Sequence, residues 1–267
     1  MTEGKPPSSG RVVRTNRSAA PTPRPAAPEP PSSVAPGPPA APPRAPEPEP
    51  LPPEADAAWL GAARSRMVEE QLRGRGIADE RVLAAMASVP REVFVLPEDR
   101  PAAYDDRPLP IGHGQTISQP YIVALQLELL ELTGDERLLE VGGGSGYAAA
   151  VASRLAREVV ATERIGGLAA RAARALARVG ATNARVLAID GQRGVPGAGP
   201  FDAILVSAAP ERFPQRLYHE LAPGGRIVVP VGDADGQRLE LVRRGPSGPQ
   251  ITHSLPCRFV PLLEGDA

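Results

Sequence analysis

From Arg137 onward, apolar runs of four to six residues alternate with stretches of helical pattern. This alternation is typical of βαβ units, in which helices join parallel strands and cover the sheet. It predicts a doubly wound α/β fold with a mostly parallel sheet. We expect strands at 138–141, 159–163, 185–189, 203–206 and 226–231, helices at 147–156, 167–179 and 214–221, and a closing antiparallel hairpin of 239–243 with 250–255.

Two helices are expected before the first of these strands. Residues 62–75 place Met67 and Leu72 on one side of a helix that glycines bring to an end. Asp79 then has the position of an N-cap for a second helix, which stops at Pro90. Since both helices precede the sheet, we expect them to form a lid or an N-terminal subdomain.

The first 53 residues differ sharply in composition from the rest of the chain. They contain 18 of the 34 prolines and few large apolar residues, so burial cannot offset the entropy of ordering them. We therefore expect residues 1–58 to be a disordered, proline-rich tail of polyproline II character, and residues 59–267 to form one folded domain. Such tails bind partners with aromatic-lined grooves, which makes proline-recognising proteins candidate partners.

The composition also argues against several classes of function. The net charge of −1 leaves no basic excess for nucleic-acid binding. The lone Cys257 excludes an internal disulfide and suggests a reducing, cytoplasmic compartment. No run approaches the roughly 18 apolar residues that a membrane helix needs. The three histidines and Cys257 lack ligand spacing, so no metal site is expected.

A glycine-rich loop follows the first strand of the predicted sheet. It lacks the G-x-G-x-x-G spacing of a dinucleotide-binding loop, because Tyr147 or Ala149 stands where the third glycine is needed. The segment instead reads E-x-G-x-G-x-G, with Glu140, Gly142, Gly144 and Gly146 at the defined positions. This pattern resembles the first motif of class I S-adenosylmethionine-dependent methyltransferases, which have a Rossmann-like fold.

Two acidic residues lie at the ends of the next two strands. Glu163 lies 21 residues beyond Gly142, where a carboxylate can accept hydrogen bonds from both ribose hydroxyls of a nucleoside. Asp190, followed by Gly191, could accept one from an adenine amine. The alternatives are a strand-end surface carboxylate for Glu163 and an ordinary Asp-Gly turn for Asp190.

A polar run, residues 109–120, precedes a helix expected to begin near Pro120. It carries three hydrogen-bonding side chains, those of Gln115, Thr116 and Ser118. A structural explanation for Ser118 is that its hydroxyl caps this helix. A functional explanation comes from the chain's resemblance to a known family.

Six segments of the chain, in order, resemble bacterial protein-L-isoaspartate O-methyltransferases. They read LPIGHGQTISQPY, LLEVGGGSGY, VVATERIGGL, PFDAILVSAAP, LAPGGRIVVPVG and RFVPL, and the resemblance covers about residues 67–263. It implies methyl transfer from S-adenosyl-L-methionine to the carboxylate of L-isoaspartyl (and D-aspartyl) residues in damaged proteins, which initiates their repair. Residues 59–267 would then be the methyltransferase catalytic domain, and isoaspartyl-containing peptides and proteins its substrates.

The resemblance also assigns roles to residues. It places the catalytic serine at Ser118 and substrate contacts at Ser118, Arg258, Phe259 and Val260. It implies a cofactor site made of Gln115, Thr116, Ile117, Ser118, Glu140, Gly142, Gly144, Gly146, Glu163, Arg164, Asp190 and Gly191. The chain departs from the family pattern at Gly143, where the family usually has Thr or Ser, and at Ile189, where it usually has Gly.

Two other functions are compatible with the sequence. A relative with the same fold and cofactor could methylate an aspartate in a dedicated precursor peptide of natural-product synthesis. A non-catalytic module could instead use its proline tail to recruit partners. Intact Ser118, Glu163 and glycine loop favour an enzyme, and the tail has too few apolar anchors to recognise a precursor peptide.

Overall fold

The structure is a computed structural model that describes Met1, residues 54–233 and residues 235–262. The predicted tail, apart from Met1 and the last few of its 58 residues, lies outside the described residues. Within them, no helix is long and apolar enough to cross a membrane. All elements below belong to the compact unit that begins at Pro48.

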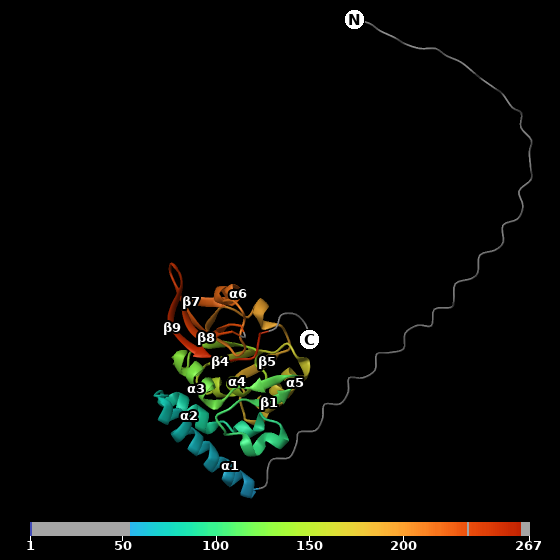
Figure 1. The fold of residues 1–267 in the computed structure, drawn as a ribbon, viewed down its shortest axis with the longest axis vertical. Coiled ribbons are helices and arrows are strands. Elements are labelled where there is room, and N and C mark those ends of the chain that lie inside the picture. The colour runs from blue at the N-terminus through green and yellow to red at the C-terminus, as the bar shows by residue number, and fades with distance from the viewer. Residues whose placement is uncertain (2–53, 234, 263–267) are drawn as a thin grey trace, which may run out of the picture. The chain divides into compact units, whose positions relative to one another are not determined.

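A seven-stranded sheet organises this unit (Figure 1). The strand order is β5-β4-β3-β6-β7-β8-β9, with β3 to β7 parallel and the last two strands antiparallel. The predicted, mostly parallel sheet with a C-terminal hairpin is therefore confirmed. The strands are β3 (Arg137–Val141), β4 (Glu158–Thr162), β5 (Ala184–Leu187), β6 (Phe201–Val206), β7 (Leu221–Gly232), β8 (Gln237–Gly245) and β9 (Gly248–Cys257).

Successive residues of each strand enter two different cores, because strand side chains alternate between the faces of the sheet. Leu138 belongs to the larger core, which is covered by α3, α4 and α5, whereas Leu139 belongs to the smaller core beneath α6. The sheet therefore has helices on both faces, with those three helices on the face of the larger core and α6 on the face of the smaller one. These helices are α3 (Pro120–Leu129), α4 (Tyr147–Ala152), α5 (Gly166–Arg178) and α6 (Gln215–Glu220).

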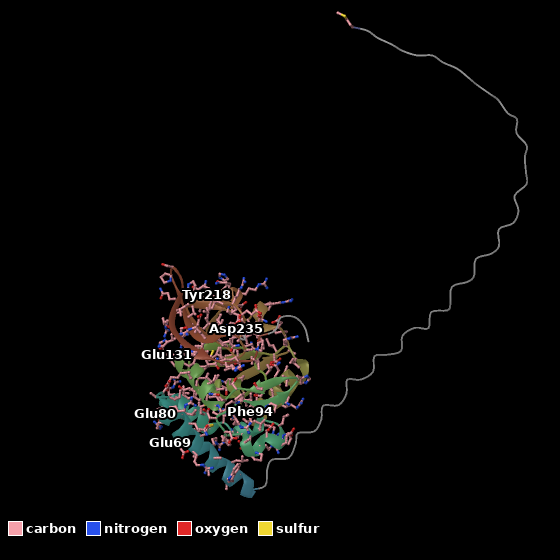
Figure 2. The ribbon with its side chains drawn as sticks, in the orientation of Figure 1. Glu69, Glu80, Phe94, Glu131, Tyr218 and Asp235 are labelled. Atoms are coloured by element: carbon pink, nitrogen blue, oxygen red, sulfur yellow. The ribbon has the colours of Figure 1, made fainter. Side chains whose placement is uncertain are left out.

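The N-terminal helices are α1 (Glu54–Arg66), which continues as a π-helical segment Met67–Leu72 and a 3₁₀ turn Arg73–Arg75, and α2 (Glu80–Ser88). Helix α1 thus starts before residue 62 and runs across the expected boundary at 58/59. Asp79 caps α2 as predicted, accepting hydrogen bonds from the backbone N–H groups of Arg81 and Val82. Figure 2 shows Glu69 and Glu80 on the solvent side of these helices.

The expectation of a separate lid or subdomain is wrong. Met67, Leu72 and Met86 are fully buried in the same core as α3 and α4, so the N-terminal helices are an integral layer of the domain. The sequence pattern identifies their apolar face but does not say which element covers it.

The polar run before α3 forms a hairpin that the sequence pattern did not predict. Strands β1 (Leu109–Gly112) and β2 (Gln115–Ile117) are antiparallel and joined by His113 and Gly114, both with left-handed backbone angles (φ +54° and +69°). The N-cap of α3 is Gln119, without a side-chain hydrogen bond. The structural explanation of Ser118 as a helix cap is therefore wrong.

Candidate active site

The glycine loop turns directly after β3. Gly142, Gly144 and Gly146 have φ angles of +82°, +52° and +86°, which favour glycine because it has no Cβ. The N–H groups of Gly142 and Gly143 donate to the Thr162 carbonyl at the end of β4, at 3.0 and 2.9 Å. The loop is thereby fixed against the carboxyl edge of the sheet, where ligands bind in open α/β folds.

Glu163 holds the tip of this loop. Its Oε2 accepts a 2.9 Å hydrogen bond from the Gly144 N–H, and its Oε1 accepts one of 2.8 Å from the Ile165 N–H. The residue is buried, so it is not the surface carboxylate that the sequence left open. Each carboxylate oxygen can accept a second hydrogen bond, which leaves acceptor capacity for a ligand.

Glu140, inside β3, is a buried acid beside the same loop. Its Oε1 accepts a 2.9 Å hydrogen bond from the Ser207 hydroxyl, while its Oε2 is buried without a partner in the described structure. Burial, together with the nearby Glu163 charge, raises the pKa of Glu140 to about 8. An unsatisfied buried carboxylate oxygen is costly, and it suggests a missing donor or cation.

Ser118 and the glycine loop line the same small cavity. The cavity has a volume of about 30 Å³, and its lining includes Thr116, Ile117 and Ser118 together with residues 142–145. The Ser118 hydroxyl makes no hydrogen bond to any described residue. The structure therefore brings the predicted catalytic serine and the glycine loop together.

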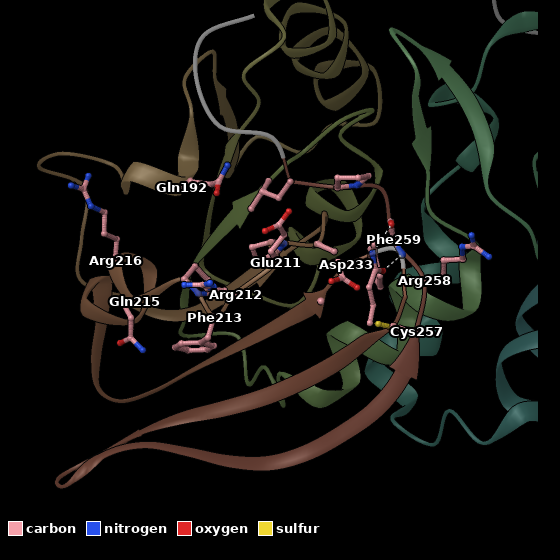
Figure 3. Close-up of a pocket in the computed structure, with 18 of the residues that line it drawn as sticks. Gln192, Glu211, Arg212, Phe213, Gln215, Arg216, Asp233, Cys257, Arg258 and Phe259 are labelled. Atoms are coloured by element: carbon pink, nitrogen blue, oxygen red, sulfur yellow. Dashed lines mark hydrogen bonds between the residues drawn. The ribbon is translucent and has the colours of Figure 1, made fainter.

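A much larger cleft of about 1550 Å³ opens beside the carboxyl ends of β5 and β6 (Figure 3). Its walls include Asp190, Pro210 and the C-terminal Arg258 and Phe259.

The C-terminal segment is held against the end of β6 by backbone bonds. The Ala209 N–H donates to the Val260 carbonyl and the Leu262 N–H to the Ala209 carbonyl, each at 2.8 Å. The predicted substrate segment, Arg258 to Val260, thus lies beside the strand edge, with the Arg258 side chain exposed and the Phe259 side chain buried.

Asp190 forms the turn that the sequence left as an alternative. Its Oδ1 accepts a 3.0 Å hydrogen bond from the Gln192 N–H and caps a 3₁₀ turn, and its Oδ2 lies 3.6 Å from Nε of Arg193. Gly191 has no room for a side chain, since an added Cβ would lie 2.0 Å from Oγ1 of Thr162. Turn geometry and close packing explain this Asp-Gly pair, and Asp190 also faces the large cleft.

Five residues of the predicted cofactor site line neither cavity: Gln115, Gly146, Glu163, Arg164 and Gly191. Gly146 has a packing role, because a Cβ there would lie 3.0 Å from the Ala172 Cβ of α5. Nε of Arg164 is buried without a hydrogen-bond partner in the described part of the chain.

Sequence reasoning missed several residues that complete the site. Ser207 holds Glu140, Gln126 of α3 donates a 3.0 Å hydrogen bond to the Val206 carbonyl, and Arg91 binds the Ser118 carbonyl. Ser207 and Gln126 also line the small cavity. Their positions at strand ends and on a buried helix face carry no local motif, so no pattern within a few residues reveals them.

Comparison with known proteins decides the family. The profile of protein-L-isoaspartate(D-aspartate) O-methyltransferases matches residues 62–267, well over half of the chain. The chain belongs to this family. As a protein-L-isoaspartate O-methyltransferase, it is a methyltransferase of protein repair that uses S-adenosyl-L-methionine as methyl donor.

Similar curated proteins support the same conclusion. Protein-L-isoaspartate O-methyltransferase 1 of Rhodopseudomonas palustris (strain HaA2) is 53% identical over 210 residues, covering 78% of this chain and 86% of the relative. The enzyme of Methylorubrum populi is 53% identical over 205 residues, covering 76% and 96%. The matches leave about a quarter of this chain unmatched.

Solved structures of the family have the same fold. A Plasmodium falciparum protein assigned as a protein-L-isoaspartate O-methyltransferase, crystallised with S-adenosyl-L-homocysteine, has a TM-score of 0.66 at 26% identity and covers 76% of this chain and 99% of its own. Another structure named protein-L-isoaspartate O-methyltransferase has a TM-score of 0.67 at 29% identity, covering 76% and 66%.

Proposed function

We propose that Ser118 orients the isoaspartyl carboxylate for methylation. The observation that carries this proposal is that Ser118 lines a cavity shared with the glycine loop, while its hydroxyl neither caps a helix nor bonds to a described residue. A carboxylate has an ordinary pKa near 4, so it is already ionised at neutral pH and needs no general base. Ser118 therefore acts as a hydrogen-bond donor that positions the nucleophile.

The residues around the loop fit the family's cofactor. S-adenosyl-L-methionine, when bound, supplies a methyl group activated by a positively charged sulfur. We propose that Glu163 accepts hydrogen bonds from the ribose hydroxyls, with Arg164 beside it, and that Asp190 and Gly191 contact the adenine. Glu140 would use its unpartnered Oε2 for the positively charged methionine end.

The remaining cofactor contacts come from the two segments that bound the small cavity. We assign them to Gly142, Gly144 and Gly146 on one side and to residues 115–118 on the other. The small cavity has about the volume of one water molecule, so it must widen to admit a methionine moiety.

Methyl transfer requires that these residues position the reacting groups and exclude water. The reacting oxygen must be held about 3 Å from the methyl carbon and in line with the departing sulfur. In the transition state, the negative charge of the carboxylate and the positive charge of the sulfonium partly neutralise each other. A pocket that excludes water therefore favours the transition state. Ser118 restricts the orientation of the carboxylate, and the loop's fixed backbone limits movement of the cofactor.

We propose that the substrate chain enters through the large cleft. Arg258, Phe259 and Val260 form part of its wall or lie in the segment that borders it. A volume of about 1550 Å³ can accept an extended, kinked chain, which unfolded or flexible proteins supply. Asparagine- and aspartate-derived damage in such segments is then accessible to the site.

The proline-rich region is proposed to be an appendage. We place the catalytic domain at residues 59–267 and the tail at residues 1–58. We propose that the tail binds proline-recognising partners. The single cysteine favours a cytoplasmic location. The family profile begins at residue 62, which supports a division near this point.

The Ser118→Ala variant tests the catalytic assignment. Methyl transfer to an isoaspartyl peptide should show a kcat reduced at least tenfold, the usual size of a lost positioning contact, with cofactor affinity nearly unchanged. Ser88→Ala, which removes a hydroxyl that bonds only within α2, is the matched control and should keep parental kcat. Equal kcat for Ser118→Ala and the parent would refute the role of Ser118.

The same assay distinguishes the substrates. An isoaspartyl peptide should be methylated, while its aspartyl twin and an aspartate-containing precursor peptide should not. Methylation of the precursor peptide alone would instead support natural-product synthesis.

A further inference from the structure

Arg91 is a fully buried arginine next to the proposed active site. It has no exposed surface and begins a 3₁₀ turn, Arg91–Val93, that follows Pro90. No carboxylate of the described residues forms an ion pair with it. Burial of a charge without a counter-ion is unfavourable unless polar groups compensate the charge. A role beyond packing is therefore expected.

Two backbone carbonyls from separate segments compensate this charge. Nε of Arg91 donates to the Ala103 carbonyl and Nη2 donates to the Ser118 carbonyl, both at 2.7 Å. Nη1 has no partner within the described structure. The planar guanidinium thus joins the loop before β1 to the residue that follows β2.

The third contact of Arg91 is aromatic. Its guanidinium carbon lies 4.7 Å from the ring centre of Tyr147, a cation–π distance. Tyr147 is the first residue of α4 and directly follows Gly146 of the glycine loop. Phe94, labelled in Figure 2, packs edge-on against the same ring, with centroids 5.5 Å apart. The ring is therefore held from two sides.

Through these contacts one side chain joins two residues that line the small cavity, Ser118 and Tyr147. We propose that Arg91 is a positioning residue that fixes the main chain at Ser118 relative to the start of α4, and so aims the Ser118 hydroxyl at the site of methyl transfer. This inference rests on the proposed role of Ser118. Arg91 touches neither substrate nor cofactor on this view; it acts through the Ser118 backbone.

Lysine cannot replace this arrangement. The guanidinium presents its donors in a rigid planar fork and stacks on aromatic rings, whereas an ammonium is a compact point charge on a flexible stem. Arg91→Lys keeps the charge but can reach only one of the two carbonyls well. The Ser118 segment should then be held less tightly, without loss of any group that binds the cofactor.

The experiment compares Arg91→Lys, Ser118→Ala and the double variant in full-length protein. Active sites are counted by titration with S-adenosyl-L-homocysteine, so that kcat refers to folded sites only. Misplacing a reacting group by a fraction of an ångström costs about tenfold or more in rate. We expect Arg91→Lys to lower kcat at least tenfold with S-adenosyl-L-homocysteine affinity within about twofold of the parent. The double variant should be no slower than Ser118→Ala, because interdependent residues act as a unit.

Arg226→Lys is the matched control. Arg226 also binds backbone carbonyls, those of Leu130 and Glu131, and pairs with Glu136 at the opposite edge of the sheet. It should lower the melting temperature without lowering kcat. If Arg91→Lys does not fold, Arg91→Gln, which buries no charge and retains one donor group, is measured in its place.

The outcomes separate the two proposals. Parental kcat in the Arg91 variant that folds, or a loss that multiplies with that of Ser118→Ala, would overturn the role of Arg91 and leave a purely structural residue. An unchanged kcat in Ser118→Ala would instead overturn the role of Ser118 itself.

Discussion

The backbone N–H of Gly144 donates a 2.9 Å hydrogen bond to the carboxylate of Glu163, 19 residues further along the chain. This bond joins the tip of the glycine loop to the end of β4. It also leaves a free acceptor site on each carboxylate oxygen. One residue thus shapes the loop and retains the acceptor capacity that we propose for the cofactor ribose.

Glu163→Gln should weaken cofactor binding about tenfold or more. The substitution replaces one carboxylate oxygen by an NH₂ group, a donor, although the N–H groups of Gly144 and Ile165 both point at this side chain. The dissociation constant for S-adenosyl-L-homocysteine, measured by calorimetry, checks this. Glu158→Gln is the control, since Glu158 lies at the other end of β4 and pairs with Arg137 and Arg185. Parental affinity in Glu163→Gln would contradict the ribose assignment.

Glu140 should make the stability of the cofactor-free protein depend on pH. Its pKa rises from an ordinary 4.5 to about 8, so the folded protein keeps a proton that the unfolded chain releases. The stabilisation associated with this proton is fully present below pH 4.5, declines as pH rises and is lost above about pH 8. Urea unfolding of the parent and Glu140→Gln checks this.

Since other groups titrate alike in both proteins, the difference between the two unfolding free energies isolates Glu140. The unfolding free energy of Glu140→Gln minus that of the parent should increase by about 1 kcal/mol or more between pH 5 and pH 8. A difference that stays constant over this interval would show that Glu140 does not titrate there.

Gly191→Ala should destabilise the domain by about 1–3 kcal/mol, because the new methyl group overlaps the buried Thr162 side chain. Thr162 is locked by its own hydrogen bond to the Glu140 carbonyl and cannot give way easily. Gly166→Ala, where nothing lies within 4 Å of the added Cβ, is the control and should change stability by less than about 0.5 kcal/mol. Equal effects of the two substitutions in urea unfolding would refute the steric explanation.

Removal of residues 2–53 should leave kcat/KM for an isoaspartyl peptide within about twofold of the full-length value, because every proposed site residue lies beyond this segment. Steady-state kinetics of the two proteins, at equal concentrations of titrated sites, checks this. A tenfold loss would mean that the tail takes part in catalysis or substrate capture.

The sequence predicted features that depend on neighbouring residues. The Asp79 cap involves bonds within three positions, and the positive φ angles of Gly142, Gly144 and Gly146 are permitted by the absence of a Cβ atom. The five parallel strands were recognisable as short apolar runs, although β7 begins at Leu221 rather than Arg226, because Leu221 pairs with Phe201 across an irregular register. Such irregularity depends on the partner strand and leaves no local signal.

Predictions about partners distant in sequence were less successful. Ser118 was an equally good helix cap on local grounds, and only the backbone at Gln119 excludes that role. Arg91 follows a proline in a charged segment, where the local pattern suggests a surface residue. Its burial depends on three other segments closing around it.

By itself, the sequence determined the family, the α/β sheet and the position of the glycine loop, because motif spacing and apolar periodicity are properties of short stretches of chain. Only the tertiary structure decided that the N-terminal helices share the main core and that Glu140 has a buried oxygen without a partner in the described structure. It also decided that Arg91 donates a hydrogen bond to the Ser118 carbonyl, 27 residues away. The physical reason is that burial and hydrogen-bond partners are set by which segments meet in space, and local chain chemistry does not specify that meeting.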